Sequence, residues 1–238
     1  MDLLQMKGQL VAWIQEKVSA AGADGTVIGI SGGIDSAVVA ALCQLAFPDN
    51  NLGVIMPCQS DPADAGLARE LAESLGIKFV ETDLSTTYQT LLAALNTDDT
   101  TRLAKANIKP RLRMTTLYYY AARHNYLVAG TGNRSEIFTG YFTKYGDGGV
   151  DMEPIGGLLK SQVRDLAKLL GVPERIITRP PTAGLWEGQT DEDELEISYE
   201  QLDKYIISGE GSDKVKEVTR RLHQSSEHKR HMPPVPEF

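Results

Sequence analysis

Short apolar runs and amphipathic stretches alternate along this chain. The apolar runs occupy residues 26–30, 52–56, 77–80 and 126–129. Runs of this length and composition are typical of strands that are buried on both faces of a sheet. Apolar residues at helical spacing occupy residues 3–20, 37–43, 64–75 and 84–95. The alternation predicts an α/β fold in which helices cover both faces of a parallel sheet.

The segments that follow the predicted strands are expected to lie together. Ligands of parallel α/β sheets bind beyond the carboxyl ends of the strands. The segments at those ends are residues 31–36, 57–61, 83 and 130–136. We expect them to line one crevice, while the sequence leaves the order of the strands open.

A loop of small residues joins the first predicted strand to the next helix. Residues 29–36 read Gly-Ile-Ser-Gly-Gly-Ile-Asp-Ser. The first N–H groups of a helix have no partner within it, so they attract anions. Gly32 and Gly33 would let the backbone approach an anion closely, and the hydroxyls of Ser31 and Ser36 would add donors. The loop is predicted to cradle phosphate, the alternative being a plain glycine-rich turn.

The loop differs from two common nucleotide-binding motifs. A P-loop requires a lysine near its end, and the glycine spacing of a dinucleotide fingerprint is absent. Asp35 stands where the lysine would be. Its carboxylate would repel phosphate unless a hard cation such as Mg²⁺ lay between them.

Composition narrows the possible partners and locations. The 238 residues include 24 Lys and Arg against 32 Asp and Glu, a net charge of −8, with no long basic block. An extended nucleic-acid surface is therefore not expected. The apolar stretches are too short for a membrane span, and the amino terminus lacks the layout of a signal peptide, so we expect a cytoplasmic protein. No linker or repeat divides the chain, and residues 1–238 are predicted to form a single domain.

Other features favour structural roles or leave two readings open. Cys43 and Cys58 match neither a disulfide framework nor a zinc site, so both are expected to be reduced and structural. Residues 96–110 and 180–196 are polar and weakly periodic, which predicts mobile segments. The acidic run from Asp191 to Glu194 fits either a solvated first helical turn or part of an active-site lid.

Two sets of motifs resemble a known family. The run Ser31-Gly-Gly-Ile-Asp-Ser36 resembles the signature of the ATP pyrophosphatase superfamily, which cleaves ATP between its α and β phosphates. The later blocks are Asn107-Ile-Lys-Pro-Arg-Leu-Arg-Met114, Gly130-Thr-Gly-Asn-Arg-Ser-Glu136, Thr143-Lys-Tyr-Gly-Asp-Gly-Gly-Val-Asp151, Leu159-Lys160, Pro181-Thr-Ala-Gly-Leu185, Asp191-Glu192 and Glu227-His-Lys-Arg230. Together they resemble the ammonia-dependent NAD synthetases over nearly the whole chain.

The resemblance implies a fold and a reaction. The fold would be Rossmann-like, of the adenine nucleotide alpha hydrolase type. ATP would adenylate the carboxylate of deamido-NAD with release of pyrophosphate, and ammonia would then displace AMP to give NAD, the last step of NAD biosynthesis. The chain is too short to include the glutaminase domain of some relatives, so free ammonia or a separate partner would supply nitrogen.

The resemblance also implies roles for residues of the ATP half. Asp35 and Glu136 would hold Mg²⁺, and Asp35 and Lys160 would be catalytic. The ATP-binding residues would be Gly29, Ile30, Ser31, Gly32, Gly33, Ile34, Asp35, Ser36, Thr131, Lys160 and Thr182. Without the resemblance, Glu136 would be read as a helix-capping carboxylate and Lys160 as a solvated helix residue.

The acceptor would be held by residues from later in the chain. The resemblance assigns the deamido-NAD site to Arg111, Lys144, Asp147, Asp151, His228 and Lys229. It also implies a homodimer with the dinucleotide across its interface. The helix that begins near Lys109, with Leu112, Leu117 and Tyr119, is apolar enough to form that interface or to be buried core.

Some questions stay open from the sequence. Ile34, at the variable position of the loop, is expected to pack beneath it. Asn133 and Arg134 replace smaller residues of relatives, which puts contacts near Glu136 in doubt. Nicotinate mononucleotide presents the same carboxylate as deamido-NAD and is an alternative acceptor. Another amidating or thiolating pyrophosphatase, or a nucleotide sensor without turnover, would share the ATP half.

Overall fold

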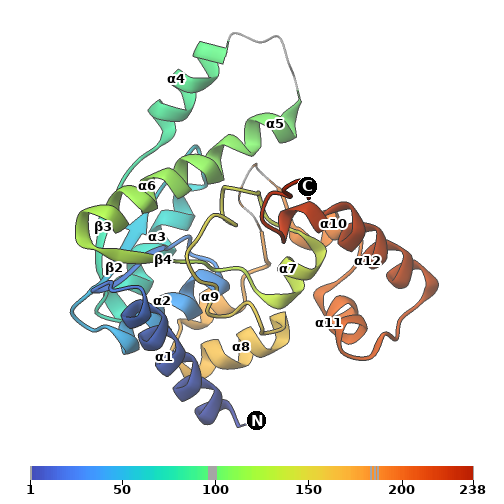
Figure 1. The fold of residues 1–238 in the computed structure, drawn as a ribbon, viewed down its shortest axis with the longest axis horizontal. Coiled ribbons are helices and arrows are strands. Elements are labelled where there is room, and N and C mark those ends of the chain that lie inside the picture. The colour runs from blue at the N-terminus through green and yellow to red at the C-terminus, as the bar shows by residue number, and fades with distance from the viewer. Residues whose placement is uncertain (1, 96–100, 183, 185, 187, 238) are drawn as a thin grey trace.

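Helices surround a small parallel sheet in the computed structural model, which describes residues 2–95, 101–182, 184, 186 and 188–237 (Figure 1). The strands are β1 (Gly25–Gly29), β2 (Asn51–Ile55), β3 (Lys78–Glu81) and β4 (Tyr126–Ala129). They pair in the order β3-β2-β1-β4, and every pairing is parallel. The predicted α/β class is confirmed, and the order is that of a Rossmann-like half.

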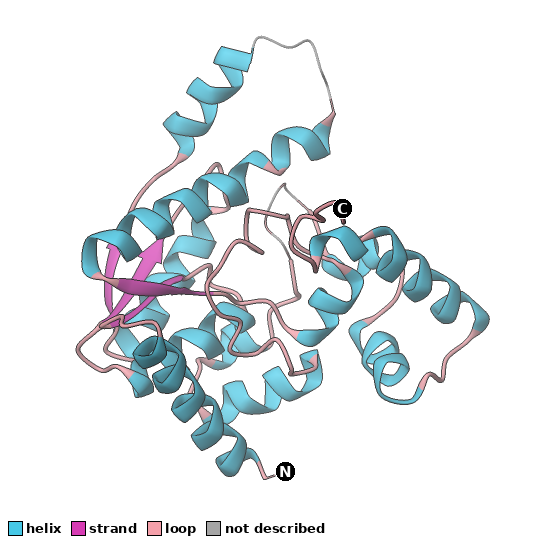
Figure 2. Cartoon of the chain, viewed as in Figure 1, coloured by secondary structure: helices cyan, strands magenta, loops and turns pink. Residues whose placement is uncertain are grey.

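Helices from different parts of the chain cover the two faces of the sheet (Figure 2). One face carries α1 (Leu3–Ala20), α2 (Ile34–Ala46), α3 (Pro62–Ser74), α8 (Lys160–Leu169) and α9 (Glu174–Ile177). The other carries α4 (Ser85–Leu95) and α6 (Ile108–His124), which is preceded by α5 (Arg102–Ala106). None of the helices in the described residues is long and apolar enough to cross a membrane.

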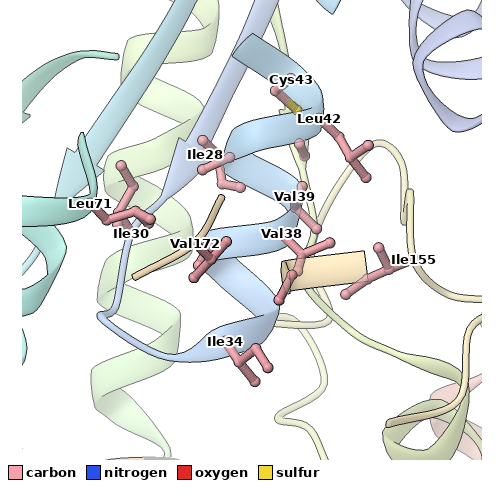
Figure 3. Close-up of a cluster of buried hydrophobic side chains, with 14 of the residues drawn as sticks. Ile28, Ile30, Ile34, Val38, Val39, Leu42, Cys43, Leu71, Ile155 and Val172 are labelled. Atoms are coloured by element: carbon pink, nitrogen blue, oxygen red, sulfur yellow. The ribbon is translucent and has the colours of Figure 1, made fainter. Parts of the chain in front are cut away.

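Alternate strand residues build the two apolar layers. Ile28 and Ile55 point toward the α2 face, where Figure 3 shows Ile28 beside Val38, Val39 and Leu42 of that helix. Their neighbours in sequence, Val27 and Val54, join the opposite cluster beneath α6. The period of two along a strand thus gives each face its own core, as expected for a sheet buried on both sides.

The strand order determines where a ligand can bind. The chain moves outward from β1 to β2 and β3, then crosses to the other side of β1 to form β4. The loops after β1 and β4 therefore diverge, and a crevice opens between them at the carboxyl ends of the strands. The loop after β1 leads into α2, whose first turn carries Asp35, and the loop after β4 leads into α7 (Arg134–Thr139), which carries Glu136.

The carboxyl-terminal helices form a third apolar cluster. They are α10 (Asp191–Leu195), α11 (Tyr199–Ser208) and α12 (Asp213–Ser225), followed by a 3₁₀ turn, η1 (Glu227–Lys229). The cluster comprises Leu195, Ile197, Tyr199, Leu202, Val215 and Val218. Its helices contact α7 and α8, so this part of the chain supports the helices that carry Glu136 and Lys160.

The expected elements agree with the structure, apart from their ends and one segment. The bounds of β1, β2 and β3 differ from the prediction by one residue, and α2 begins at Ile34 rather than at residue 37. Residues 96–110 were expected to be a mobile polar segment, but their described part contains α5, and α6 begins at Ile108, one residue before the predicted start near Lys109. A helix of five residues such as α5 has too few turns for a periodic pattern to be recognised. Residues 96–100 lie outside the described part.

Candidate active site

A cavity of about 850 Å³ opens at the carboxyl ends of the strands. Each segment expected to meet there contributes to its wall, including Ser31, Asp61, Asp83 and Thr131. The expectation of one shared crevice is therefore confirmed. Its volume lies within the usual range for sites that bind small molecules.

The loop after β1 is braced by its own serines. The Ser31 and Ser36 hydroxyls lie 3.0 Å apart, Gly33 N donates to Ser31 Oγ at 3.2 Å, and Ser36 Oγ donates to Gly33 O at 2.9 Å. Here these hydroxyls fix the shape of the loop rather than extending from it. Gly32 adopts a φ of +79° with α3 backbone against it, where a side chain would clash. Ile34 packs into the core beneath the loop, as expected.

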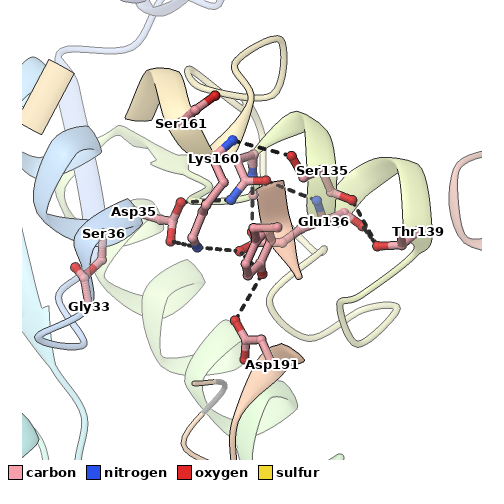
Figure 4. Close-up of polar contacts among 12 residues, drawn as sticks. Gly33, Asp35, Ser36, Ser135, Glu136, Thr139, Lys160, Ser161 and Asp191 are labelled. Atoms are coloured by element: carbon pink, nitrogen blue, oxygen red, sulfur yellow. Dashed lines mark hydrogen bonds and ion pairs between the residues drawn. The ribbon is translucent and has the colours of Figure 1, made fainter. Parts of the chain in front are cut away.

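Two carboxylates, from the first turns of the helices that follow β1 and β4, contact one lysine (Figure 4). Lys160 Nζ lies 2.5 Å from Asp35 Oδ2 and 3.0 Å from Glu136 Oε1, and its side chain is almost fully buried. The solvated-helix reading of Lys160 is wrong for this structure. Burial alone would lower the pKa of Lys160, but Asp35 and Glu136 raise it above its usual value.

Glu136 is a strongly perturbed acid. Burial raises the pKa of its carboxyl to about 7, against the opposing effect of Lys160. Its backbone N–H donates the N-cap bond of α7 to Asn133 Oδ1, and its side chain accepts from Asn133 N in a capping box. Glu136 therefore caps α7 as the local pattern suggested, and it also lines the cavity. A perturbed acid in a cavity is typical of functional sites.

Asn133 links the two loops. Its side-chain oxygen caps α7, and its amide donates to Asp35 Oδ1 at 2.8 Å. The side chain is fully buried. Asn133, one of the two residues that put contacts near Glu136 in doubt, therefore joins α7 to the first turn of α2.

Tyr199 closes the cluster from α11. Lys160 Nζ lies 4.7 Å from the centre of its ring, and its hydroxyl lies 3.0 Å from Asp191 Oδ2 and 3.3 Å from Glu136 Oε1. Asp191 is buried, and burial raises the pKa of its carboxyl. The acidic run does form a first helical turn, capped by Thr190, but its first member faces the cavity. A lid role for the segment remains a prediction.

Residues expected to bind the acceptor occupy another part of the cavity. Arg111, Lys144, Asp147, His228 and Lys229 all line it. Lys144 Nζ donates to His228 O, and Lys229 Nζ donates to the carbonyls of Gly140 and Phe142. Burial raises the pKa of the Asp147 carboxyl, although Thr143 N donates to it.

Asp151 does not line the cavity. Its carboxylate accepts from Val128 N at 2.8 Å and from the Tyr118 hydroxyl at 2.9 Å, so it joins β4 to α6. Gly32 is likewise absent from the wall, whereas Gly29, Ile30, Thr131 and Thr182 contribute to it.

The carboxyl-terminal turn is fastened to α7. Arg230 donates to the carbonyls of Ile137 and Phe138 and to Ser226 Oγ. A cation at the last carbonyls of a helix is favourable. This contact within one chain holds the tail beside the cavity.

The cysteines behave as the sequence suggested. Both are free and buried, and burial raises the pKa of the Cys43 thiol to about 12 and that of the Cys58 thiol above its usual value. Thiols of this kind are poor nucleophiles. Across the described residues, no group of three or more His, Cys, Asp or Glu side chains could hold a metal ion by itself.

Sequence reasoning missed several residues of the site. Asn133, Tyr199 and Asp203 gain their roles from partners more than sixty positions away. Glu153 lies beneath the loop after β4 and accepts from Gly132 N at 2.9 Å. The glycines at 130 and 132 were the sequence signal for this contact, because they indicate that another group lies close to the backbone. A Cβ at Gly130 would lie only 2.4 Å from Glu153 Oε2.

Known proteins resemble this chain along nearly all of its length. The sequence model of the NAD synthase family matches residues 6–233. A Carboxydothermus hydrogenoformans protein named NH3-dependent NAD+ synthetase is 52% identical over 231 residues, which are 96% of this chain and 95% of that protein.

Solved structures agree with the sequence comparison. NMN synthetase from Francisella tularensis superposes with a TM-score of 0.96 at 38% identity, and NH3-dependent NAD synthetase from Campylobacter jejuni with 0.83 at 32%. Both alignments cover 100% of each chain. By the family match and these similarities, the chain belongs to the NAD synthase family.

Proposed function

We propose that this protein is a ligase that converts the nicotinate carboxylate of deamido-NAD to the amide of NAD, using ATP and ammonia. The acceptor carboxylate attacks the α-phosphorus of ATP, so a carboxyl O–P bond forms while the α–β bridge breaks and pyrophosphate leaves. Ammonia then attacks the carbonyl carbon, and AMP departs. Family membership supports this reaction.

The main observation behind the proposal is that the carboxylates of Asp35 and Glu136 both form ion pairs with Lys160, next to the loop after β1. Adenylyl transfer needs no protein nucleophile. It needs alignment of two anionic reactants and neutralisation of the charge that develops on the phosphates. We assign the phosphates to residues 29–36 and Lys160, and further ATP contacts to Thr131 and Thr182.

Mg²⁺ fits the pair of carboxylates. Asp35 and Glu136 face one point that already favours a cation, since both contact the Lys160 ammonium. Protein sites usually hold Mg²⁺ through one or two carboxylates together with substrate phosphates. When bound there, the ion would stabilise charge on the departing pyrophosphate.

We assign the acceptor to Arg111, Lys144, Asp147, His228 and Lys229, which line the same cavity. We further propose a homodimer in which the acceptor lies across the interface. Tyr119, on α6, is 59% exposed, so this helix leaves an aromatic side chain open to contact with a second copy. Asp151 bonds to the neighbouring Tyr118, so a second copy seated on α6 would bring its acceptor close to Asp151.

The decisive experiment supplies the purified chain with ATP, Mg²⁺, saturating ammonium and deamido-NAD. Mass spectrometry should find NAD, AMP and pyrophosphate in equal amounts. Lys160→Met should abolish turnover, whereas Lys168→Met, an exposed position on the same helix, should not. Formation of ADP and orthophosphate would contradict the proposal.

Nicotinate mononucleotide is the second candidate acceptor, because the Francisella tularensis NMN synthetase matches this fold so closely. The same assay with that acceptor measures the preference as a ratio of kcat/KM values. A higher value for the mononucleotide would replace deamido-NAD as the substrate. Absence of amide with both acceptors would refute the ligase assignment.

A further inference from the structure

Arg113 reaches from α6 into the cavity wall with only neutral partners. Its Nε donates to Met56 O at 3.2 Å, and its Nη2 donates to Ser60 Oγ at 3.0 Å. These two bonds fix the plane of the guanidinium against the loop after β2. Neither bond uses Nη1.

Charge pairing divides the cations of the cavity into two groups. Lys160, Arg179 and Arg69 each have a carboxylate within 4.0 Å. Arg111, Arg113, Lys144 and Lys229 have none among the residues that the structure describes. Three of these four are the cations already assigned to the acceptor, and Arg113 is the fourth.

The surroundings of Arg113 favour an anionic ligand. Burial lowers the pKa of its guanidinium, although an arginine stays charged in proteins. Asp147 and Asp64 act on it electrostatically from beyond ion-pair distance. A buried charge whose partners are neutral is costly until a counter-charge arrives.

We infer that Arg113 binds the carboxylate of the acceptor's pyridine ring, the group that becomes adenylated. This inference rests on the proposed function. Arg113 is set deeper than the exposed Arg111 on the same helix, and Asp147, which we assign to the acceptor, is among the charges acting on it. A guanidinium suits a carboxylate because its planar donors match two carboxylate oxygens.

The contact with Arg113 would affect both the binding of the substrate and the release of the product. It keeps the carboxylate ionised, as an oxygen that attacks phosphorus must be, and it holds that oxygen in place. The amide product has no negative charge, so it loses the ion pair with Arg113. Substrate acid is thereby bound in preference to product amide.

The test compares two ligands that differ only in that group. Calorimetry without ATP measures the Kd of deamido-NAD and of NAD for wild type and for Arg113→Gln. Because Arg113→Gln removes a charge-assisted contact, it should raise the Kd of deamido-NAD about tenfold or more and change the Kd of NAD by less than about twofold. Arg123→Gln, an exposed arginine in the last turn of α6, should change neither value.

Other results overturn the inference. Equal weakening of both ligands would mean that Arg113 contacts phosphate or only supports the wall, and an unchanged Kd would remove it from binding. If Arg113→Gln does not fold, Arg113→Lys, which keeps the charge without the planar donors, should weaken deamido-NAD more than NAD. The mononucleotide acid and amide replace this pair if the mononucleotide is the acceptor. Amide formation by wild type tests the proposed function separately.

Discussion

The Asp203 carboxylate, on α11, accepts from both the backbone N–H and the hydroxyl of Ser161, at 3.0 and 2.9 Å. Its other oxygen accepts from Ser135 Oγ at 2.6 Å, and that hydroxyl in turn accepts from Lys160 N. A single buried acid therefore joins the first turn of α8 to α7. Lys160 and Glu136 lie beside these two contacts, so Asp203 sets their relative position although it does not line the cavity.

Asp203→Ala should leave buried donors without an acceptor and lower both stability and turnover. We expect a loss of about 2–4 kcal/mol in unfolding free energy. At a temperature where the variant is folded by circular dichroism, kcat should still fall about tenfold, with the KM for ATP less affected. Glu200→Ala, an exposed acid on the same helix, is the control. A folded Asp203→Ala enzyme with normal kcat would show that the contact is only structural.

Asp35→Asn should reduce turnover at least about a hundredfold, because it removes a proposed metal ligand and a partner of Lys160. Steady-state rates over a range of Mg²⁺ concentrations should show a higher requirement for the ion. The exposed Asp165 on α8 provides the matched Asp165→Asn control. A rate equal to wild type would remove Asp35 from the mechanism.

Asn133 allows its two contacts to be separated. Serine is a good N-cap, but its side chain is shorter and lacks the amide group that donates to Asp35. Asn133→Ser should therefore keep the cap of α7 and lose the hydrogen bond to Asp35. We expect thermal stability close to wild type with a turnover several-fold lower. Ser212→Ala removes the N-cap of α12, away from the cavity, and should cost about 1 kcal/mol with no change in rate. If Asn133→Ser has full activity, the bond to Asp35 does not matter.

Glu153 should make the ligand-free protein less stable as the pH rises. Burial raises the pKa of its carboxyl from 4.5 to about 8. A carboxyl whose pKa is raised by folding contributes stability that is fully present below pH 4.5, the unfolded pKa. That contribution is lost as the pH rises through the folded pKa of about 8. Glu136 contributes in the same direction, and its contribution is lost as the pH rises through about 7.

Glu153→Gln should therefore match wild type at pH 5 and exceed its Tm by roughly 3 °C or more at pH 9. Differential scanning calorimetry across that range measures the effect. Glu73→Gln, an exposed acid on α3, should keep the wild-type profile. A parallel decline in Glu153→Gln and wild type would contradict this account.

Local sequence signals were enough for the sheet and for the loop after β1. Residues 126–129 were predicted with the bounds of β4, because a buried strand is recognised from its own apolar run. The meeting of Asp35 with Glu136 followed from a general rule for parallel sheets, although the strand order was unknown.

The remainder of the site depends on long-range contacts that no local pattern encodes. Lys160 is a polar residue at a helix start, and only the fold encloses it between two acids and the Tyr199 ring. Asp203 resembles any acid on an amphipathic helix until α11 packs on α8. Asp151 shows the converse, because a motif residue expected near the acceptor makes its hydrogen bonds to β4 and α6 and does not line the cavity of this chain.

Arg230 makes the placement of Glu136 depend on a segment far away in the sequence. The short helix that presents Glu136 has its final carbonyls bonded to this arginine, which lies more than ninety positions later. A protease that cut between the two would leave the parallel sheet intact, because its four strands end at residue 129. Limited proteolysis of the tail would therefore disturb the cavity while the sheet stays folded.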